Sequence, residues 1–248
     1  SRHRTSYSLG DAYPPELQAS LAPLVPELVQ DIPIDAYESA QINAEGPFPI
    51  VLHSHGLGGT PRDSSQQLQH LASWGFVVAA PDHGSRDAAA VAANAVVTEG
   101  DPDVADLRAT LDVLSRENTR PGSPLLTGLD TTAVAAEGLD VGALAAYRFA
   151  ISEPKVKVWA GQAPVAPAPD ALVPLADVQA QYDQLAAPKR LAVVRNAGHA
   201  AFVDACAPSW RRGGLGPYAA QYPALVPLLQ RNDDGCAVEN IDPARASA

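Results

Sequence analysis

The chain has no run of eighteen or more apolar residues, which excludes a membrane-spanning helix of ordinary length. Basic residues are scarce, because 17 lysines and arginines stand against 28 acidic residues, a formal net charge of −11. Such a surface repels phosphate backbones, so nucleic acid is not an expected partner. Methionine is absent, and the start, Ser1-Arg2-His3-Arg4, has no apolar signal region. Removal of a signal peptide and trimming of the chain would both explain this start.

Cysteine is nearly absent as well, with Cys206 and Cys236 as the two examples. Each lies in a turn-rich segment beside polar residues, so we expect a disulfide between them, although two buried thiols are the alternative. A disulfide is typical of an oxidising compartment. We therefore expect a secreted or periplasmic protein, and the sequence does not predict its oligomeric state.

Apolar residues are plentiful, at 46% of 248 residues, which is enough for one large core. Short apolar runs alternate with helical patterns along the chain after residue 46. Most of these runs are apolar on both faces, which is typical of a parallel sheet covered by helices on both sides. We expect one α/β domain over residues 1–248, with 1–46 as an irregular extension that contains the first strands. The runs that predict strands are 48–53, 76–80, 132–137, 156–159 and 191–194, and helices are expected at 64–74, from Asp101, and at 143–151, 178–185 and 218–229.

Chemically active residues follow several of these strands, and the carboxyl ends of parallel strands meet at one edge of a sheet. The most specific of these segments is Gly138-Leu139-Asp140-Val141-Gly142, between a predicted strand and a predicted helix. A G-x-Nu-x-G turn in that position forces its central residue, the nucleophile, into an exposed, strained conformation. The alternative is an ordinary turn with two glycines. The other segments are His53–Gly59, Asp82-His83 and Gly198-His199.

Four stretches of the sequence resemble the α/β-hydrolase superfamily, near bacterial esterases of the dienelactone hydrolase, platelet-activating-factor acetylhydrolase and cutinase-like group. They are Pro49–Gly59, Leu71–His83, Val134–Arg148 and Asp177–Asp204. The resemblance implies an α/β-hydrolase fold with Asp140 at the nucleophile position and His199 as the base. It also implies an oxyanion hole formed by the backbone N–H groups of Leu57 and Val141.

The acid of the site is harder to place, because only 59 residues separate Asp140 from His199 (199 − 140) and one strand is missing or irregular there. Asp170 is the preferred residue, since the segment that follows it resembles the acid turn of the family. Asp177 and Asp183 are the alternatives, and Asp170 could also be an ordinary turn or capping aspartate. The residues expected to line the pocket are His55, Gly56 and His83.

Aspartate replaces the serine of the esterases at position 140, and a carboxylate can attack carbon directly to form an ester that water then cleaves. The leading hypothesis is therefore a hydrolase that acts on a small ester-like or electrophilic substrate through Asp140. The alternatives are an esterase scaffold whose serine has been replaced, and a binding protein without catalysis. No cofactor is expected. His53 and His55 lie two residues apart, but no carboxylate or cysteine cluster completes a metal site there, so none is expected.

Overall fold

The structure is a computed structural model that describes residues 4–23, 29, 31–93, 101–162 and 175–193. The chain divides into two compact units. Unit 1 comprises residues 1–7 and 31–162, and unit 2 comprises residues 8–30 and 163–248. Among the described residues, no helix has both the length and the apolar character needed to cross a membrane. The prediction of a single domain stays a prediction.

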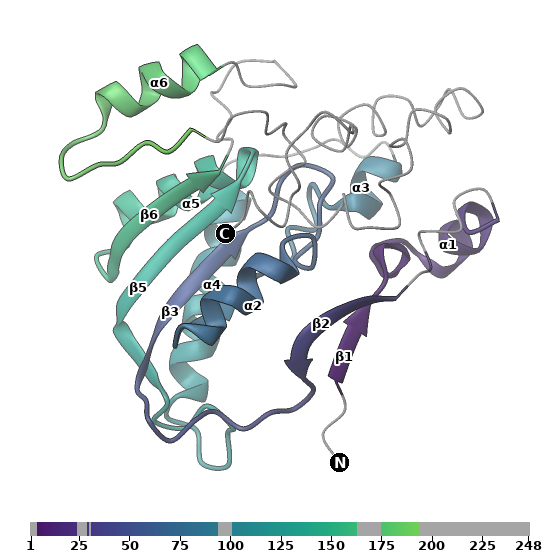
Figure 1. Ribbon diagram of the computed structural model, residues 1–248, viewed down its shortest axis with the longest axis horizontal. Helices are drawn as coiled ribbons and strands as arrows, with labels where there is room; N and C mark the ends of the chain where they lie inside the picture. Colours follow the sequence, from purple (N-terminus) through teal and green to yellow (C-terminus); the bar gives the residue numbers. More distant parts are fainter. Residues whose placement is uncertain (1–3, 24–28, 30, 94–100, 163–174, 194–248) are drawn as a thin grey trace. The chain divides into compact units, whose positions relative to one another are not determined.

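Unit 1 is built on a four-stranded parallel sheet with the strand order β4-β3-β5-β6 (Figure 1). Parallel strands need long crossover connections, and helices supply them here. The strand order places β3 and β5 at the centre, with their carboxyl ends side by side, since Ser54 pairs with Gly138. The strands are β3 (Phe48–Ser54), β4 (Val77–Ala79), β5 (Leu129–Leu139) and β6 (Val156–Gln162).

Helices lie on both faces of this sheet, which confirms the predicted α/β-hydrolase type of architecture. In Figure 1, α2 (Ser65–Ser73) lies on one face, and α4 (Asp101–Glu117) and α5 (Val141–Ser152) lie on the other. The short helix α3 (Ala88–Ala92) precedes α4. Apolar side chains from β3, β5, α4 and α5 form the main core, which is the burial that the apolar runs predict. Its largest fully buried members are Ile50, Leu52, Leu107, Leu111, Val134 and Phe149.

A separate antiparallel pair precedes the sheet in unit 1. It consists of β1 (Arg4–Tyr7) and β2 (Ile32–Tyr37), with Tyr7 opposite Ile32. The apolar pattern predicts a strand near residues 29–34, and β2 begins at Ile32, three residues after the predicted start.

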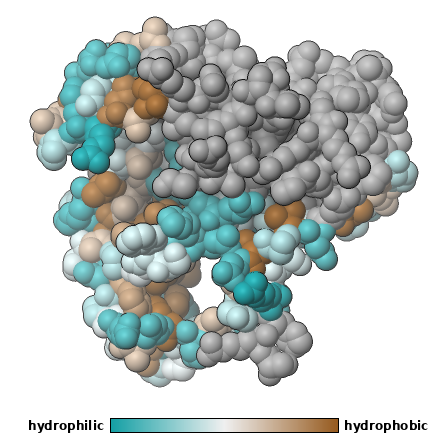
Figure 2. Space-filling model, in the orientation of Figure 1, coloured by the Kyte–Doolittle hydropathy of each residue, from teal (hydrophilic) through white to brown (hydrophobic). Residues whose placement is uncertain are grey.

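Some apolar side chains of unit 1 are exposed to solvent, Trp74 among them at 74% exposure. On the face shown in Figure 2, apolar residues are interleaved with polar ones.

Unit 2 contributes three described elements: the 3-10 helix η1 (Leu9–Ala12), α1 (Pro15–Leu21) and α6 (Leu175–Gln184). The region before residue 46 was expected to be irregular apart from its strand, so η1 and α1 correct that expectation. Proline at the first position of α1 explains the helix, because its fixed φ suits a helix start. The strand expected from Leu191 is not formed by residues 191–193, the described part of that segment. The predicted helix at 218–229 lies outside the described residues.

Candidate active site at the carboxyl edge of the sheet

Asp140 is the single residue between β5 and α5, so the sharp turn predicted for this segment is present. The predicted exposure of its central residue is wrong, because Asp140 is only 2% exposed. Its backbone has φ 58° and ψ −128°, a conformation that a residue with a side chain rarely adopts. The flanking glycines allow this turn. A Cβ on Gly142 would lie 2.1 Å from the carbonyl oxygen of Ser54, and one on Gly138 would lie 2.3 Å from the carbonyl oxygen of Gly142. Side chains at these positions would therefore push β3, β5 and α5 apart.

The carboxylate of Asp140 turns away from its own helix and toward the loop after β3. It makes no side-chain capping bond to α5. Instead, the backbone N–H of Leu57 donates a hydrogen bond to Asp140 Oδ2 at 3.1 Å. Gly56 lies close behind, because a Cβ there would be 3.3 Å from the same oxygen. The structure thus brings together two of the predicted site residues, Asp140 and Leu57. Val141, the other expected oxyanion donor, is the first residue of α5 and is buried.

The loop that carries Leu57 is held by backbone hydrogen bonds to the segment after β4. Gly58 N–H donates to the carbonyl oxygen of Arg86 at 2.8 Å, and Ala88 N–H donates to that of Gly59 at 3.2 Å. Gly58 has φ +67°, a left-handed conformation that glycine adopts without strain. These contacts fix the position from which Leu57 reaches Asp140.

His55 is a buried residue whose two ring nitrogens both form hydrogen bonds with backbone groups. Nδ1–H donates to the carbonyl oxygen of Gly56 at 2.9 Å, and Nε2 accepts from the backbone N–H of His83 at 3.1 Å. His55, Gly56 and His83, the expected pocket residues, are all buried among the described residues. Their role toward a substrate stays a prediction.

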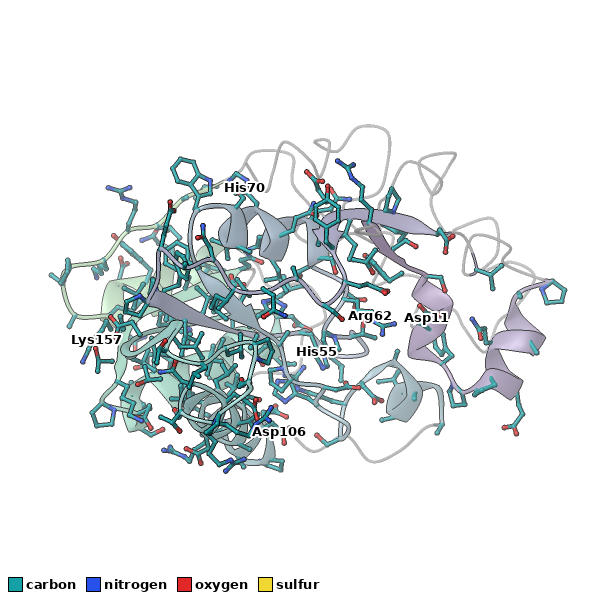
Figure 3. All side chains as sticks on the ribbon, turned by 90° about the horizontal axis from the view of Figure 1, so that it is seen from below. Asp11, His55, Arg62, His70, Asp106 and Lys157 are labelled. Atoms are coloured by element: carbon teal, nitrogen blue, oxygen red, sulfur yellow. The ribbon has the colours of Figure 1, made fainter. Side chains whose placement is uncertain are left out.

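His83 belongs to a buried polar cluster that the sequence did not predict. Its Nδ1–H donates to Asp106 Oδ2 at 2.9 Å, and its Nε2 accepts from the hydroxyl of Ser54 at 2.8 Å. Arg86 donates from Nε to Asp103 Oδ2 at 2.9 Å and from Nη2 to Ser54 Oγ at 3.0 Å. Figure 3 labels His55 and Asp106, which mark the position of this cluster.

Burial controls the ionisation of this cluster. Desolvation, together with the positive charge of Arg86, lowers the pKa of His83 to about 3, so the imidazole is neutral at physiological pH. Burial also raises the pKa of Asp106 above its usual value. A sequence signal for the cluster exists in the spacing of Asp103 and Asp106, because residues i and i+3 share one face of a helix.

A second polar group joins β3, β5 and α2 beside the turn from β5 to α5 at Asp140, which we call the elbow. His53 Nδ1–H donates to Glu137 Oε1 at 2.8 Å, and Gln67 Nε2 donates to Glu137 Oε2 at 3.0 Å. His53 and His55 thus have different partners. Among the described residues, the group with the geometry of a metal site is His83, Asp103 and Asp106, which does not include either of these histidines.

The remaining predicted site residues lie outside the described residues or in unit 2. His199, Asp170, Cys206 and Cys236 lie outside the described residues. Asp177 and Asp183, the alternatives for the acid, are on α6 in unit 2, where Asp183 is exposed and accepts a hydrogen bond from Gln179. The roles of base, acid and disulfide therefore stay predictions.

Comparison with protein families gives one match, to the family of platelet-activating factor acetylhydrolase, isoform II, over residues 14–118. The match includes β3, the loop with Leu57, and the residues of the buried cluster around His83. It ends before Asp140, so it does not bear on the replacement of serine by aspartate. No curated protein matches the chain. The match and the parallel sheet together support a hydrolase of the α/β type.

Proposed function

We propose that the chain is a hydrolase in which the Asp140 carboxylate attacks an electrophilic carbon of a small substrate. The hydrogen bond from Leu57 N–H to Asp140 Oδ2 carries this proposal. It holds one carboxylate oxygen in the place where an oxyanion hole would bind it. In this proposal the other oxygen, Oδ1, is the attacking atom.

The reaction takes two steps. Asp140 Oδ1 forms a bond to the substrate carbon while the bond to the leaving group breaks and its electron pair departs with that group. The product of this step is an ester between Asp140 and the substrate carbon. His199 then removes a proton from water, and the resulting hydroxide attacks the carboxyl carbon of Asp140. Leu57 and Val141 N–H groups stabilise the oxyanion that forms on Oδ2, and its collapse releases an alcohol and regenerates the carboxylate.

Each part of the turn suits this chemistry. The strained backbone of Asp140 is costly, on the order of 1–3 kcal/mol, and such strain is typical of functional sites. Gly138 and Gly142 permit the close approach of strand and helix that the strain requires. The roles of His199 as base and Asp170 as its acid partner are part of the proposal.

A second candidate function is favoured by the family match. The matched family is named for an acetylhydrolase, and the Leu57 loop lies within the match. On this alternative, the chain is an esterase scaffold in which aspartate has replaced the serine. The elbow and the Leu57 donor would then still be able to serve a serine hydroxyl at position 140.

One set of variants separates these functions. The chain is incubated with a panel of esters, epoxides and haloalkanes, and its intact mass and product release are measured. For an aspartate nucleophile, His199→Gln should accumulate a covalent adduct on Asp140, and Asp140→Asn should form none. Asp112→Asn, an exposed carboxylate change on α4, is the control and should behave as wild type.

Each of the three functions predicts a different result for these variants. Turnover by the wild type without any adduct in His199→Gln would refute the aspartate nucleophile. For the replaced serine, Asp140→Ser should hydrolyse short-chain aryl esters that the wild type leaves intact, and an inert Asp140→Ser would refute that alternative. A non-catalytic binding protein would show no turnover in any of these variants.

A further inference from the structure

Three side chains outside the proposed nucleophile site converge in the geometry of a metal centre. They are His83, from the segment after β4, and Asp103 and Asp106, one turn apart on α4. His83 Nδ1 lies 2.9 Å from Asp106 Oδ2 and 3.7 Å from Asp103 Oδ1. Each of the three residues offers one ligand atom within 4.8 Å of those of the other two. We propose that this cluster binds a divalent transition-metal ion of the zinc type, with one nitrogen and two carboxylate ligands.

The second observation is an unsatisfied oxygen that faces this point. Asp103 is 1% exposed, and its Oδ1 has no hydrogen-bond partner among the described residues. Its other oxygen, Oδ2, accepts from Arg86. A buried carboxylate oxygen without a partner is costly and uncommon in folded proteins. A cation between Asp103 Oδ1 and His83 Nδ1 would satisfy it.

The charges around the cluster also suit a divalent cation. Arg86 and Asp103 balance one another, and Asp106 adds a further negative charge. With a metal on Nδ1, the ring proton would reside on Nε2 and point at Ser54 Oγ, which lies 2.8 Å away. Such a partner on the second nitrogen is common for metal-binding histidines.

Solvent can reach the cluster from one side. The side chain of Asp106 is 41% exposed, whereas those of His83 and Asp103 are buried. Asp106 therefore marks the entry for the ion. A fourth ligand from water would be supplied on this side, as in zinc sites that have three protein ligands.

The proposed ion would stabilise the loop that carries Leu57. Arg86 lies three residues after His83 and donates from Nη1 to the carbonyl oxygens of His55 and Gly56. Its own carbonyl oxygen accepts from Gly58 N–H. An ion that fixes His83 and Asp103 would also fix Arg86, and through it the loop. We assign the ion this structural role, which does not depend on the proposed nucleophile.

The test is zinc binding by the full chain after treatment with a chelator. Isothermal titration with Zn²⁺ should show one site in the wild type, and the thermal unfolding midpoint should rise with Zn²⁺ concentration. Asp106→Ala should weaken this binding at least ~10-fold, because loss of even an indirect partner has that effect. Asp112→Ala is the matched control, since Asp112 is an exposed carboxylate on the same helix and lies outside the cluster.

Cobalt identifies the ligands independently of any variant. Co²⁺ in the wild type should give the visible bands of nitrogen and oxygen coordination, without an intense thiolate charge-transfer band. A thiolate band would place the metal on Cys206 or Cys236 and overturn the proposal. Absence of Zn²⁺ binding, or equal affinity in Asp106→Ala and wild type with matching circular dichroism spectra, would overturn it as well.

Discussion

Replacing Arg86 with methionine should destabilise the fold more than the loss of any surface arginine. Its side chain is fully buried and donates four hydrogen bonds to oxygen atoms. Methionine keeps much of the volume but removes the charge, so Asp103 would be left as a buried carboxylate without its cation. Breaking a buried ion pair in this way costs about 3–5 kcal/mol. The carbonyl oxygens of His55 and Gly56 would also lose a donor.

The assay is equilibrium unfolding in urea with a chelator present, so that metal binding does not contribute. With a slope of about 2–3 kcal/mol per molar urea, the midpoint should fall by roughly 1 to 2.5 M. Arg108→Met is the control. Arg108 is on α4 and bonds to Glu153 at 3.1 Å, but its side chain is 43% exposed, so its loss should cost under about 1 kcal/mol. A cost for Arg86→Met no larger than that for Arg108→Met would refute the reasoning.

A double variant distinguishes the loss of the pair from general damage to packing. Arg86→Met with Asp103→Leu removes both charges, and apolar replacement of a buried pair is often nearly neutral. The double variant should therefore be more stable than the sum of the two single changes predicts, by about 1–3 kcal/mol. Additive costs would mean that the two side chains do not depend on one another. If Arg86→Met does not fold, Arg86→Lys should give an intermediate loss, because lysine keeps the charge without the planar set of donors.

Two shorter predictions concern the turn and the cysteines. Gly142→Ala should prevent native folding or lower the thermal unfolding midpoint severely, because the new Cβ would lie 2.1 Å from the carbonyl oxygen of Ser54. Gly84→Ala is the control. A Cβ at Gly84 would meet no atom within 4 Å, so the midpoint should stay nearly unchanged. Equal midpoints for the two variants would contradict the close approach at the elbow. Thiol titration of denatured, unreduced chain should find no free thiol if Cys206 and Cys236 are bonded, and closing a loop of about 30 residues should contribute around 3–4 kcal/mol. Two free thiols would exclude the disulfide.

The sheet and the elbow could be predicted because their signals are local. The apolar runs at 48–53 and 156–159 predict parallel strands, and both lie within observed strands, although only the first of these strands is buried. The two glycines around Asp140 predict a sharp turn because a close approach needs them. The run at 191–194 is apolar throughout, but its described residues, 191–193, form no strand. Composition alone does not determine whether a partner strand is available.

The buried cluster could not be predicted in the same way. Asp103 and Asp106 alternate with apolar residues on α4, which is also the pattern of a helix with one solvated face. Arg86 follows a glycine and a serine and has the sequence features of a loop residue. Its burial depends on the carbonyl groups of the Leu57 loop, which are 30 residues away in the chain. Hydrogen bonds between residues so far apart in the chain leave no periodic signal in the sequence.

The group beside the elbow gives a last prediction, which depends on whether an amide can replace a carboxylate. Glu137 accepts from His53 Nδ1–H and from Gln67 Nε2. In Glu137→Gln, the new amide oxygen can still accept from His53, and the new amide nitrogen then faces Gln67. Gln67 can accept from that nitrogen if its own amide group turns over. This rotation breaks no hydrogen bond of Gln67 Oε1, because that atom has no partner among the described residues. The variant should then lose only about 1 kcal/mol, whereas Glu137→Ala should lose about 2–3 kcal/mol, because it leaves the buried His53 donor unpaired.

Adding Gln67→Leu to Glu137→Gln tests that exchange directly. Leucine cannot offer an oxygen, so the new amide N–H groups of residue 137 would be buried without an acceptor from Gln67. The double variant should be less stable than the sum of its single changes by about 1 kcal/mol or more, measured by urea unfolding. If the two changes are additive, or if Glu137→Gln is as destabilised as Glu137→Ala, then the charge of Glu137 is what His53 requires, and the exchange of amide partners is wrong.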